Sequence, residues 1–253
     1  ALALGDLTEG VRQLLRQLNV LMQFLMEQLC RLLPLFIVVM MVSQTWSGTL
    51  GALLSCWFPV LIVGIAVVLL LTGLYVLTSL TSRVPIPTLV RACIPAHVIA
   101  FTTASASAAF GTMVSTCKDD LGVDDDQVSF GVPLGLVMCK CSMAIMIFIM
   151  MIYSAKVYGV GADVMWYVRL GITAFLYAIA VPPVPGGMLA CYSIILTNMG
   201  IPLDALAVVT AVDLMIDNLL ASSNVGALIL TVFSSAHKLD AVDKDKLAKL
   251  QRQ

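Results

Sequence analysis

Three long apolar runs constrain the fold of this chain more than any other feature. They cover residues 18–46, 50–80 and 206–233, and each can cross the hydrocarbon core of a bilayer, which takes about 20 residues of α-helix. The composition agrees, because 60% of the residues are hydrophobic and 11% are charged, whereas soluble domains are about 45 to 50% apolar. The sequence therefore predicts an all-α polytopic membrane protein.

The charged residues lie mostly at the ends of the chain and in its loops. A net charge of −1 leaves no basic surface for a nucleic acid, so we expect the lipid bilayer and no nucleic acid as a partner. Arg83, Arg91 and Lys118 fall on the same side of the expected topology as the basic C-terminal tail, whereas Lys156 and Arg169 fall on the other. By the positive-inside rule the C-terminus is cytoplasmic, and we expect a plasma membrane, the bacterial inner membrane, as the location.

Two further segments contain apolar arms that are too short to cross. Residues 90–121 and 164–199 each hold two arms of roughly a dozen residues, about 18 Å of helix at 1.5 Å per residue. The arms are separated by tips at 102–107 and 181–187, which are rich in small residues or in proline and glycine. Irregular backbone inside a bilayer is tolerated only against protein or a watery cavity. We therefore expect two re-entrant helical hairpins, each followed by a spanning helix, as an inverted repeat with its site between the tips.

The last apolar run carries two carboxylates and an amide. A charged residue at the centre of a spanning helix costs about 2.5 to 3.5 kcal/mol on insertion scales, so it usually faces a cavity, a partner or a substrate. Asp213 and Asp217 are four residues apart and share a helix face. We expect Asp217 to bind substrate and Asp213 to have a structural or ion-pair role, with Lys140, which interrupts the apolar stretch 132–158, as its partner. Asn224 either holds a helix open at the site or bonds a neighbouring helix.

The two tips supply the other candidate binding residues. Ser105 and Ser107 could bind a substrate carboxylate through hydroxyl and backbone N–H groups at helix ends, or they could simply allow close packing. In the second tip, proline removes backbone donors and glycine permits positive φ. Val181, Pro185 and Gly186 are the candidates there.

The order of these elements resembles a known family. The resemblance rests on the residues at 101–107, 132–135, 184–186, 200–203 and 213–224. In order and spacing these segments resemble the glutamate/aspartate and neutral amino acid transporters, the dicarboxylate/amino acid:cation symporters, from about residue 11 to residue 236. The resemblance implies a secondary transporter with an elevator-type mechanism, not an enzyme. It also implies a homotrimer if N-terminal scaffold helices are present.

The same resemblance implies a division into three parts. Residues 1–85 would form two scaffold-side transmembrane helices, residues 86–236 a transport domain, and residues 237–253 a charged cytoplasmic tail. Within the transport domain we expect a hairpin at 88–121, a broken helix at 130–158, a hairpin at 162–200 and a final helix at 204–235.

The sequence departs from the family pattern at the substrate site. The resemblance implies that Asp217 binds the substrate ammonium group. Family members that carry acidic substrates have an arginine three residues later, where this chain has Leu220. A buried substrate carboxylate without that partner would cost several kcal/mol of desolvation. We therefore expect a small neutral amino acid, or a related zwitterionic or carboxylate metabolite.

The coupling-ion sites depart further. The positions of the two sodium-binding carboxylates are Cys141 and Leu228 here, and sodium requires oxygen ligands. We expect no family-type sodium coupling, no metal site at Cys139 and Cys141, and no cofactor. Lys140 could act as a tethered cation, or could carry a proton if its pKa is lowered by burial.

The absence of both sodium carboxylates and of the arginine also allows a second interpretation. The chain could be a membrane receptor, a channel-like protein or a partner-binding protein that keeps the fold without transporting.

Overall fold

The computed structural model describes residue 17, residues 57–181, residues 188–243 and residue 246. Apart from residue 17, these residues belong to one unit of the chain, residues 52–253. The apolar run at 18–46 and most of the second tip, including Pro185 and Gly186, lie outside the described residues.

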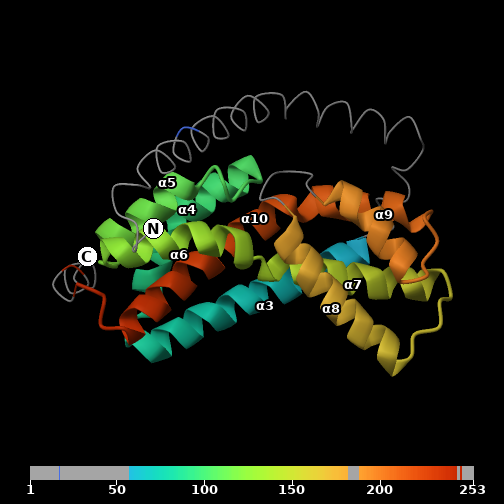
Figure 1. Ribbon diagram of the computed structural model, residues 1–253, viewed down its shortest axis with the longest axis horizontal. Helices are drawn as coiled ribbons and strands as arrows, with labels where there is room; N and C mark the ends of the chain where they lie inside the picture. Colours follow the sequence, from blue (N-terminus) through green and yellow to red (C-terminus); the bar gives the residue numbers. More distant parts are fainter. Residues whose placement is uncertain (1–16, 18–56, 182–187, 244–245, 247–253) are drawn as a thin grey trace, which may run out of the picture. The chain divides into compact units, whose positions relative to one another are not determined.

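Eight α-helices and one π-helical turn follow one another in the described part of the chain (Figure 1). They are α3 (Trp57–Ser82), α4 (Ile86–Thr103), α5 (Phe110–Ser115), the π turn η2 (Thr116–Asp120), α6 (Asp125–Met138), α7 (Cys141–Val157), α8 (Val164–Ala180), α9 (Leu189–Asn198) and α10 (Ala205–Lys238). Four segments are long and apolar enough to cross a membrane: α3, α4, α6 together with α7, and α10. The predicted all-α polytopic class is confirmed.

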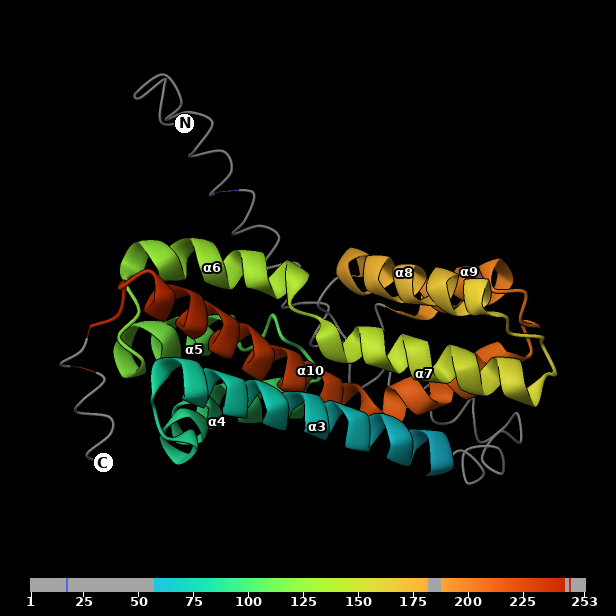
Figure 2. The same ribbon diagram turned by 90° about the horizontal axis from the view of Figure 1, so that it is seen from below.

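Helix α10 lies at the centre of the described helices and contacts α3, α4, α6, α7 and α9. In Figure 2 it runs between α6 on one side and α3 with α4 on the other. We call α4 with α5 the first hairpin, and α8 with α9 the second hairpin. One hydrophobic cluster, which includes Tyr192 and Val209, joins the second hairpin and α7 to the N-terminal half of α10. Another, which includes Leu89, Met113 and Phe233, joins the first hairpin and α6 to its C-terminal half.

The tip of the first hairpin begins later than predicted. Helix α4 continues through Thr102 and Thr103, whose hydroxyl groups donate to backbone carbonyls one turn back at 2.9 and 2.7 Å. Such side-chain bonds to the preceding turn let threonine remain inside a helix. The helix is capped by Ala104, whose φ of 48° is left-handed. The connection therefore spans residues 104–109 instead of 102–107.

The apolar stretch at 132–158 is broken at Lys140. Helix α6 ends at Met138, and α7 begins at Cys141. Lys140 is the N-cap residue of α7, but its side chain makes no capping bond. Because helix ends leave backbone groups without partners, this break requires partners from other elements.

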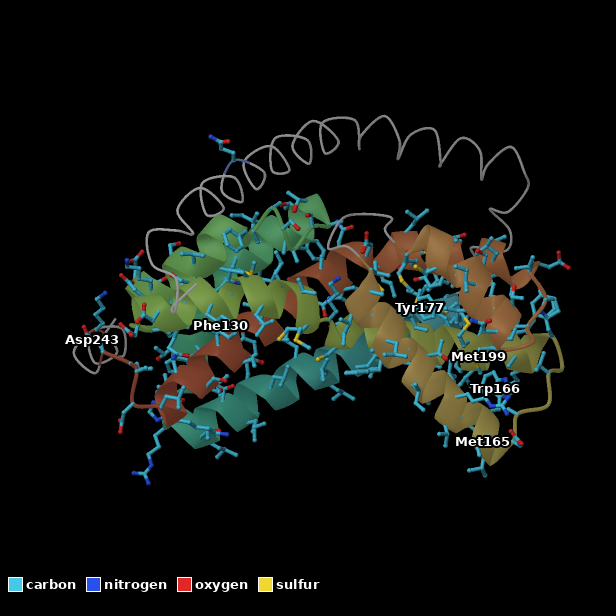
Figure 3. All side chains as sticks on the ribbon, in the orientation of Figure 1. Phe130, Met165, Trp166, Tyr177, Met199 and Asp243 are labelled. Atoms are coloured by element: carbon cyan, nitrogen blue, oxygen red, sulfur yellow. The ribbon has the colours of Figure 1, made fainter. Side chains whose placement is uncertain are left out.

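A side-chain hydrogen bond joins the two arms of the second hairpin at the end opposite its tip. Asp163 caps α8 by accepting a hydrogen bond from the backbone N of Trp166 at 2.7 Å. The indole Nε1 of Trp166 donates to the backbone O of Met199 at 3.0 Å, just beyond α9 (Figure 3). Gly200 follows with a φ of 70°, the conformation that ends many helices. The Trp166–Met199 bond therefore ties the start of one arm to the end of the other.

The segment after α10 folds back onto the loop before α6. An antiparallel bridge joins Val123 to Val242, and the backbone N of Asp243 donates to the O of Gly122 at 2.8 Å. Gly122 has a φ of 68°, and a Cβ there would lie 3.0 Å from the O of Asp243. The start of the predicted tail is thus bonded to the protein. The domain boundaries stay a prediction.

Candidate functional site

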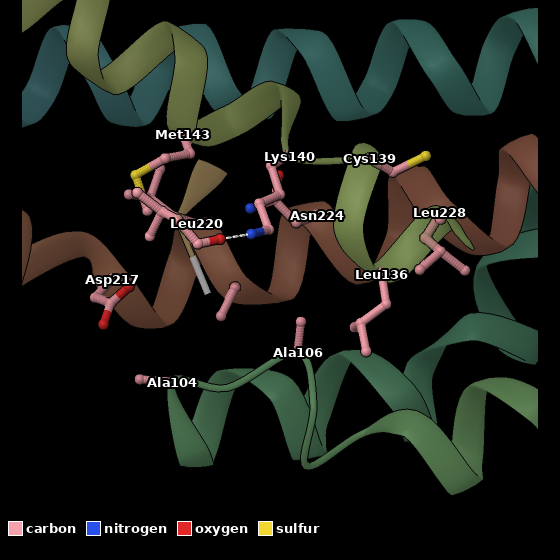
Figure 4. A pocket seen from close by; sticks show the side chains of 13 residues that line it. Ala104, Ala106, Leu136, Cys139, Lys140, Met143, Asp217, Leu220, Asn224 and Leu228 are labelled. Atoms are coloured by element: carbon pink, nitrogen blue, oxygen red, sulfur yellow. Dashed lines mark hydrogen bonds between the residues drawn. The ribbon is translucent and has the colours of Figure 1, made fainter. Parts of the chain in front are cut away.

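A small cavity lies where the tip of the first hairpin meets α6, α7, α10 and the end of α8 (Figure 4). It measures about 40 Å³, which is room for a few water molecules at roughly 10 to 15 Å³ each. The described residues that line it are Ala104, Ala106, Gly135, Leu136, Cys139, Lys140, Met143, Val181, Asp217, Leu220, Ala221, Asn224 and Leu228. Four predicted site residues therefore meet around one space: Lys140, Val181, Asp217 and Asn224.

The two carboxylates of α10 have different surroundings. Asp217 is half-buried and lines the cavity, at the same end as Ala104 in Figure 4. Asp213 is 2% exposed and is not among the residues that line the cavity; its carboxylate lies beside the hydroxyl of Tyr192 instead. Its Oδ1 atom has no hydrogen-bond partner. Asp213 forms no ion pair with Lys140 in the described part of the chain, so the predicted pairing of these two residues is absent there.

Lys140 fills the break between α6 and α7. It is buried, and its ammonium group donates a hydrogen bond to the backbone O of Val181, drawn as a dashed line in Figure 4. Val181 caps the C-terminus of α8, where carbonyl groups lack helical partners and the helix dipole is negative. A positive charge is therefore held against the last carbonyl before the second tip.

Asn224 and its neighbour cap the broken end of α7. The side-chain Oδ1 of Asn224 accepts a hydrogen bond from the backbone N of Ser142 at 3.1 Å. The hydroxyl of Ser142 donates to the hydroxyl of Ser223 at 2.8 Å. The bond to Asn224 satisfies a backbone donor in the first turn of α7, which the side chain of the N-cap residue Lys140 does not reach. Of the two roles expected for Asn224, bonding to a neighbouring helix is present, at the broken helix itself. That Asn224 holds a helix open at the site stays a prediction, as does a substrate role.

The two positions at which the resemblance implies sodium-binding carboxylates carry a hydrocarbon side chain, Leu228, and a thiol, Cys141. Leu228 is buried and packs onto Gly135 so closely that a Cβ on the glycine would lie 2.8 Å from the leucine Cγ. Cys141 is exposed and Cys139 half-buried. Among the described residues no group of three or more His, Cys, Asp or Glu side chains could hold a metal ion.

The first tip places its serines differently from its alanines. Ala104 and Ala106 line the cavity, whereas Ser105 and Ser107 are not among the lining residues. Ser105 is 2% exposed, and its hydroxyl accepts a hydrogen bond from the backbone N of Ala108 at 3.3 Å. In this conformation Ser105 therefore shapes the tip, and a substrate role for the serines stays a prediction.

Sequence reasoning assigned no site role to a group of polar residues between α3, α4 and α10. His97 is hydrogen-bonded through Nε2 to the hydroxyl of Tyr75 and through Nδ1 to the hydroxyl of Ser222, both at 2.9 Å. One turn away, Asn218 Nδ2 donates to the backbone O of Phe101 at 2.7 Å. The four-residue spacing of Asn218 and Ser222 on an apolar helix was the available signal.

The sequence as a whole was compared with known proteins. Residues 1–236 match the sodium:dicarboxylate symporter family. The chain belongs to that family. The predicted resemblance is confirmed, and with it the expectation of a multi-pass membrane protein. Symporters are transporters and not enzymes, which agrees with the prediction that the chain is not an enzyme.

Its relatives in the symporter family include animal transporters. An excitatory amino acid transporter of Caenorhabditis elegans is 30% identical over 159 residues, 61% of this chain and 31% of the relative. Excitatory amino acid transporter 2 of Mus musculus is 25% identical over 265 residues, 96% of this chain and 44% of the relative. Excitatory amino acid transporter 1 of Homo sapiens is 27% identical over 180 residues, 70% of this chain and 33% of the relative. The chain thus spans less than half the length of these relatives.

Proposed function

We propose that the protein is a secondary carrier of small neutral amino acids or related zwitterionic or carboxylate metabolites. The observation that supports this most directly is the cavity, which combines the carboxylate of Asp217 with the hydrocarbon side chain of Leu220. A substrate ammonium group would bind the carboxylate of Asp217. An acidic substrate side chain would meet hydrocarbon at Leu220, and the Lys140 ammonium in the same cavity is already bonded to the O of Val181, so acidic amino acids are disfavoured.

The carrier would work without family-type sodium coupling. The ammonium of Lys140 already neutralises the C-terminal end of α8 through the carbonyl of Val181, which is the kind of negative helix end that attracts a cation. A tethered cation does not dissociate, so exchange or facilitated transport is the leading mode, and proton coupling through Lys140 is the other.

We propose an elevator-type movement of residues 86–236 and a homotrimer built through N-terminal scaffold helices. We further propose that the protein resides in a bacterial inner membrane, with its C-terminus in the cytoplasm.

Ligand binding is the first test. The purified full chain is heated with a panel of amino acids and small carboxylates, with sodium replaced by choline. A ligand at 100 times its dissociation constant stabilises by about 2.7 kcal/mol. We expect a neutral amino acid to raise the melting temperature without sodium, and Asp217→Asn to abolish the shift. Asp204→Asn is the matched control, because Asp204 is exposed at the start of α10. A shift that requires sodium would refute the coupling proposal.

The role of Lys140 is tested separately, by uptake into proteoliposomes. We expect Lys140→Met to lose sodium-independent uptake, whereas Lys156→Met, which changes an exposed lysine in the last turn of α7, retains it. If a proton gradient does not change uptake by the wild type, proton coupling is excluded and exchange or facilitation remains.

One observation favours the alternative, a receptor or partner-binding protein that does not transport. The cavity of about 40 Å³ is smaller than an amino acid, and Leu228 fills the space beside Gly135 with hydrocarbon. The absence of any thermal shift across the whole panel would favour this alternative over transport.

A further inference from the structure

A polar seam connects the first hairpin to α10. On α10 it consists of Asn218, Ser222 and Gly226, which are four residues apart and therefore share one face. On α4 it consists of His97 and Phe101, also four apart. Asn218 Nδ2 bonds the O of Phe101 at 2.7 Å, and the hydroxyl of Ser222 bonds His97 Nδ1 at 2.9 Å. The seam thus holds two antiparallel helices together at successive turns.

At the Gly226 end of the seam, the imidazole of His97 lies close to the backbone of α10. A Cβ on Gly226 would lie 2.8 Å from Nε2 of His97, so the imidazole ring rests directly against the backbone of α10. From α3, the hydroxyl of Tyr75 bonds the same Nε2 atom at 2.9 Å. The imidazole is therefore fixed on three sides, by α3, by its own helix and by α10.

On both helices, the seam residues are close in sequence to residues that line the cavity. Asn218 directly follows Asp217, and Ala104, where the tip begins, is three residues after Phe101, about 4.5 Å along a helix axis. Both Ala104 and Asp217 line the cavity. A slip of one turn, about 5.4 Å, would break both seam hydrogen bonds in a surrounding where lost polar partners are costly.

We propose that His97 and Asn218 are positioning residues that fix the register between the first tip and Asp217, and thereby set the affinity for the ligand of Asp217. The part of this proposal that concerns ligand affinity, the affinity part, rests on the proposed function. The part that concerns the register of the tip, the structural part, does not. His97 and Asn218 touch no ligand in this scheme; they act through the backbone of the tip.

The structural part is tested by hydrogen exchange of the tip amides, residues 104–109, in the full chain without ligand. The variants are Asn218→Leu, which removes the donor at similar size, and His97→Met, with His97→Gln as the conservative replacement. We expect exchange at the tip to rise about tenfold in the first two, the effect of about one lost hydrogen bond, and to be largely restored in His97→Gln. Asn198→Leu, at an exposed amide on α9, is the control. Unchanged exchange in both folded variants would overturn the proposal.

The affinity part is tested by a double-mutant cycle on the dissociation constant of one probe, the neutral amino acid that gives the largest thermal shift in sodium-free buffer. Asn218→Leu is combined with Ser105→Ala, which alters the tip itself. If Asn218 acts through the tip, each single variant weakens binding roughly fivefold to tenfold, and the double variant is little worse than Ser105→Ala alone. Additive losses, or unchanged binding in Asn218→Leu, would overturn the affinity part. If the wild type binds nothing while tip exchange responds as expected, the proposed function fails and the positioning role stands.

Discussion

The two hairpins are held to the rest of the protein by different forces. The first hairpin is hydrogen-bonded to α10 through its first arm, by Asn218 to Phe101 and by Ser222 to His97. The second hairpin meets α10 through an apolar cluster that includes Tyr192, and at its tip end the backbone O of Val181 accepts the Lys140 ammonium.

This difference indicates which hairpin can move more easily. In a membrane interior, breaking a side-chain hydrogen bond leaves polar groups without water, whereas apolar surfaces can exchange protein contacts for lipid contacts at little cost. The arms of the second hairpin should therefore shift against α10 more easily than the first arm of the first hairpin, and any movement of the tip end of the second hairpin must also break the bond from Lys140 to Val181.

Gly226→Leu should cause the largest loss, because it attacks the attachment of the first hairpin. A Cβ at this position meets His97 Nε2 at 2.8 Å and Leu71 Cδ1 at 3.0 Å. Overpacking and the displaced histidine bonds together should lower the free energy of unfolding by about 3 kcal/mol. Denaturant titration of the full chain in detergent measures this. Gly64→Leu is the matched control, since nothing lies within 4 Å of a Cβ there. If both variants lose the same free energy of unfolding, the first hairpin is not attached to α10 through the seam.

Asn224→Leu should cost about 2 kcal/mol, because α7 loses the acceptor for its Ser142 N–H and capping losses reach this size. Asn224→Asp should retain most of the stability, since a carboxylate accepts the same bond and is favoured at a helix N-terminus. Thermal melting of the two variants side by side gives the answer. If the aspartate variant is no more stable than the leucine variant, Asn224 does not act as a cap.

Trp166→Phe should affect only the second hairpin. It removes the bond from the indole to the O of Met199, worth about 1 kcal/mol. Hydrogen exchange should accelerate in α9 and remain unchanged in α4, which distinguishes the two hairpins. Trp57→Phe, at a ring 63% exposed, serves as the control. Faster exchange in α4 as well would mean that the hairpins are not independent.

The smallest effect is expected from pH, at the base of the first hairpin. The hydrogen bond from Lys118 to Asp125, at 2.9 Å, and their charge attraction raise the pKa of the lysine. A raised pKa in the folded state gives a stabilisation that is complete below the unfolded pKa, about 10.4, and is lost as the pH rises through the folded value. The melting temperature should fall slightly more above pH 10 in the wild type than in Asp125→Asn. Parallel curves would show that this exposed pair contributes nothing.

Much of the fold could be predicted from periodicity and composition. The spanning character of α3 and α10 and the break at Lys140 follow from apolar run length and from the cost of an interior charge. The start of the first tip could not be predicted, because Thr102 and Thr103 are compatible with a turn or a helix. Their hydroxyl bonds to the preceding turn decide for the helix.

The candidate site was predicted as a set of residues, but its contacts were not. Asp217, Lys140, Val181 and Asn224 were all expected, and they line one cavity. The expected pairing of Lys140 with Asp213 is not formed in the described residues, because the ammonium bonds the end of α8 instead. Spacing along a helix predicts which side chains share a face. It does not predict whether Lys140 bonds Asp213 on α10 or the O of Val181, because that choice depends on where α8 ends.

The order and types of the residues are enough to establish that this chain is an all-α membrane protein and that it belongs to a symporter family. They also show where polar residues interrupt the apolar helices. These properties depend on run length, residue type and order, which are local. Three contacts follow only from the packing of the helices: Asn224 caps α7, His97 joins three helices, and Lys140 faces Val181. Each of these contacts brings together residues at least 22 positions apart in the chain, so it depends on how whole helices pack.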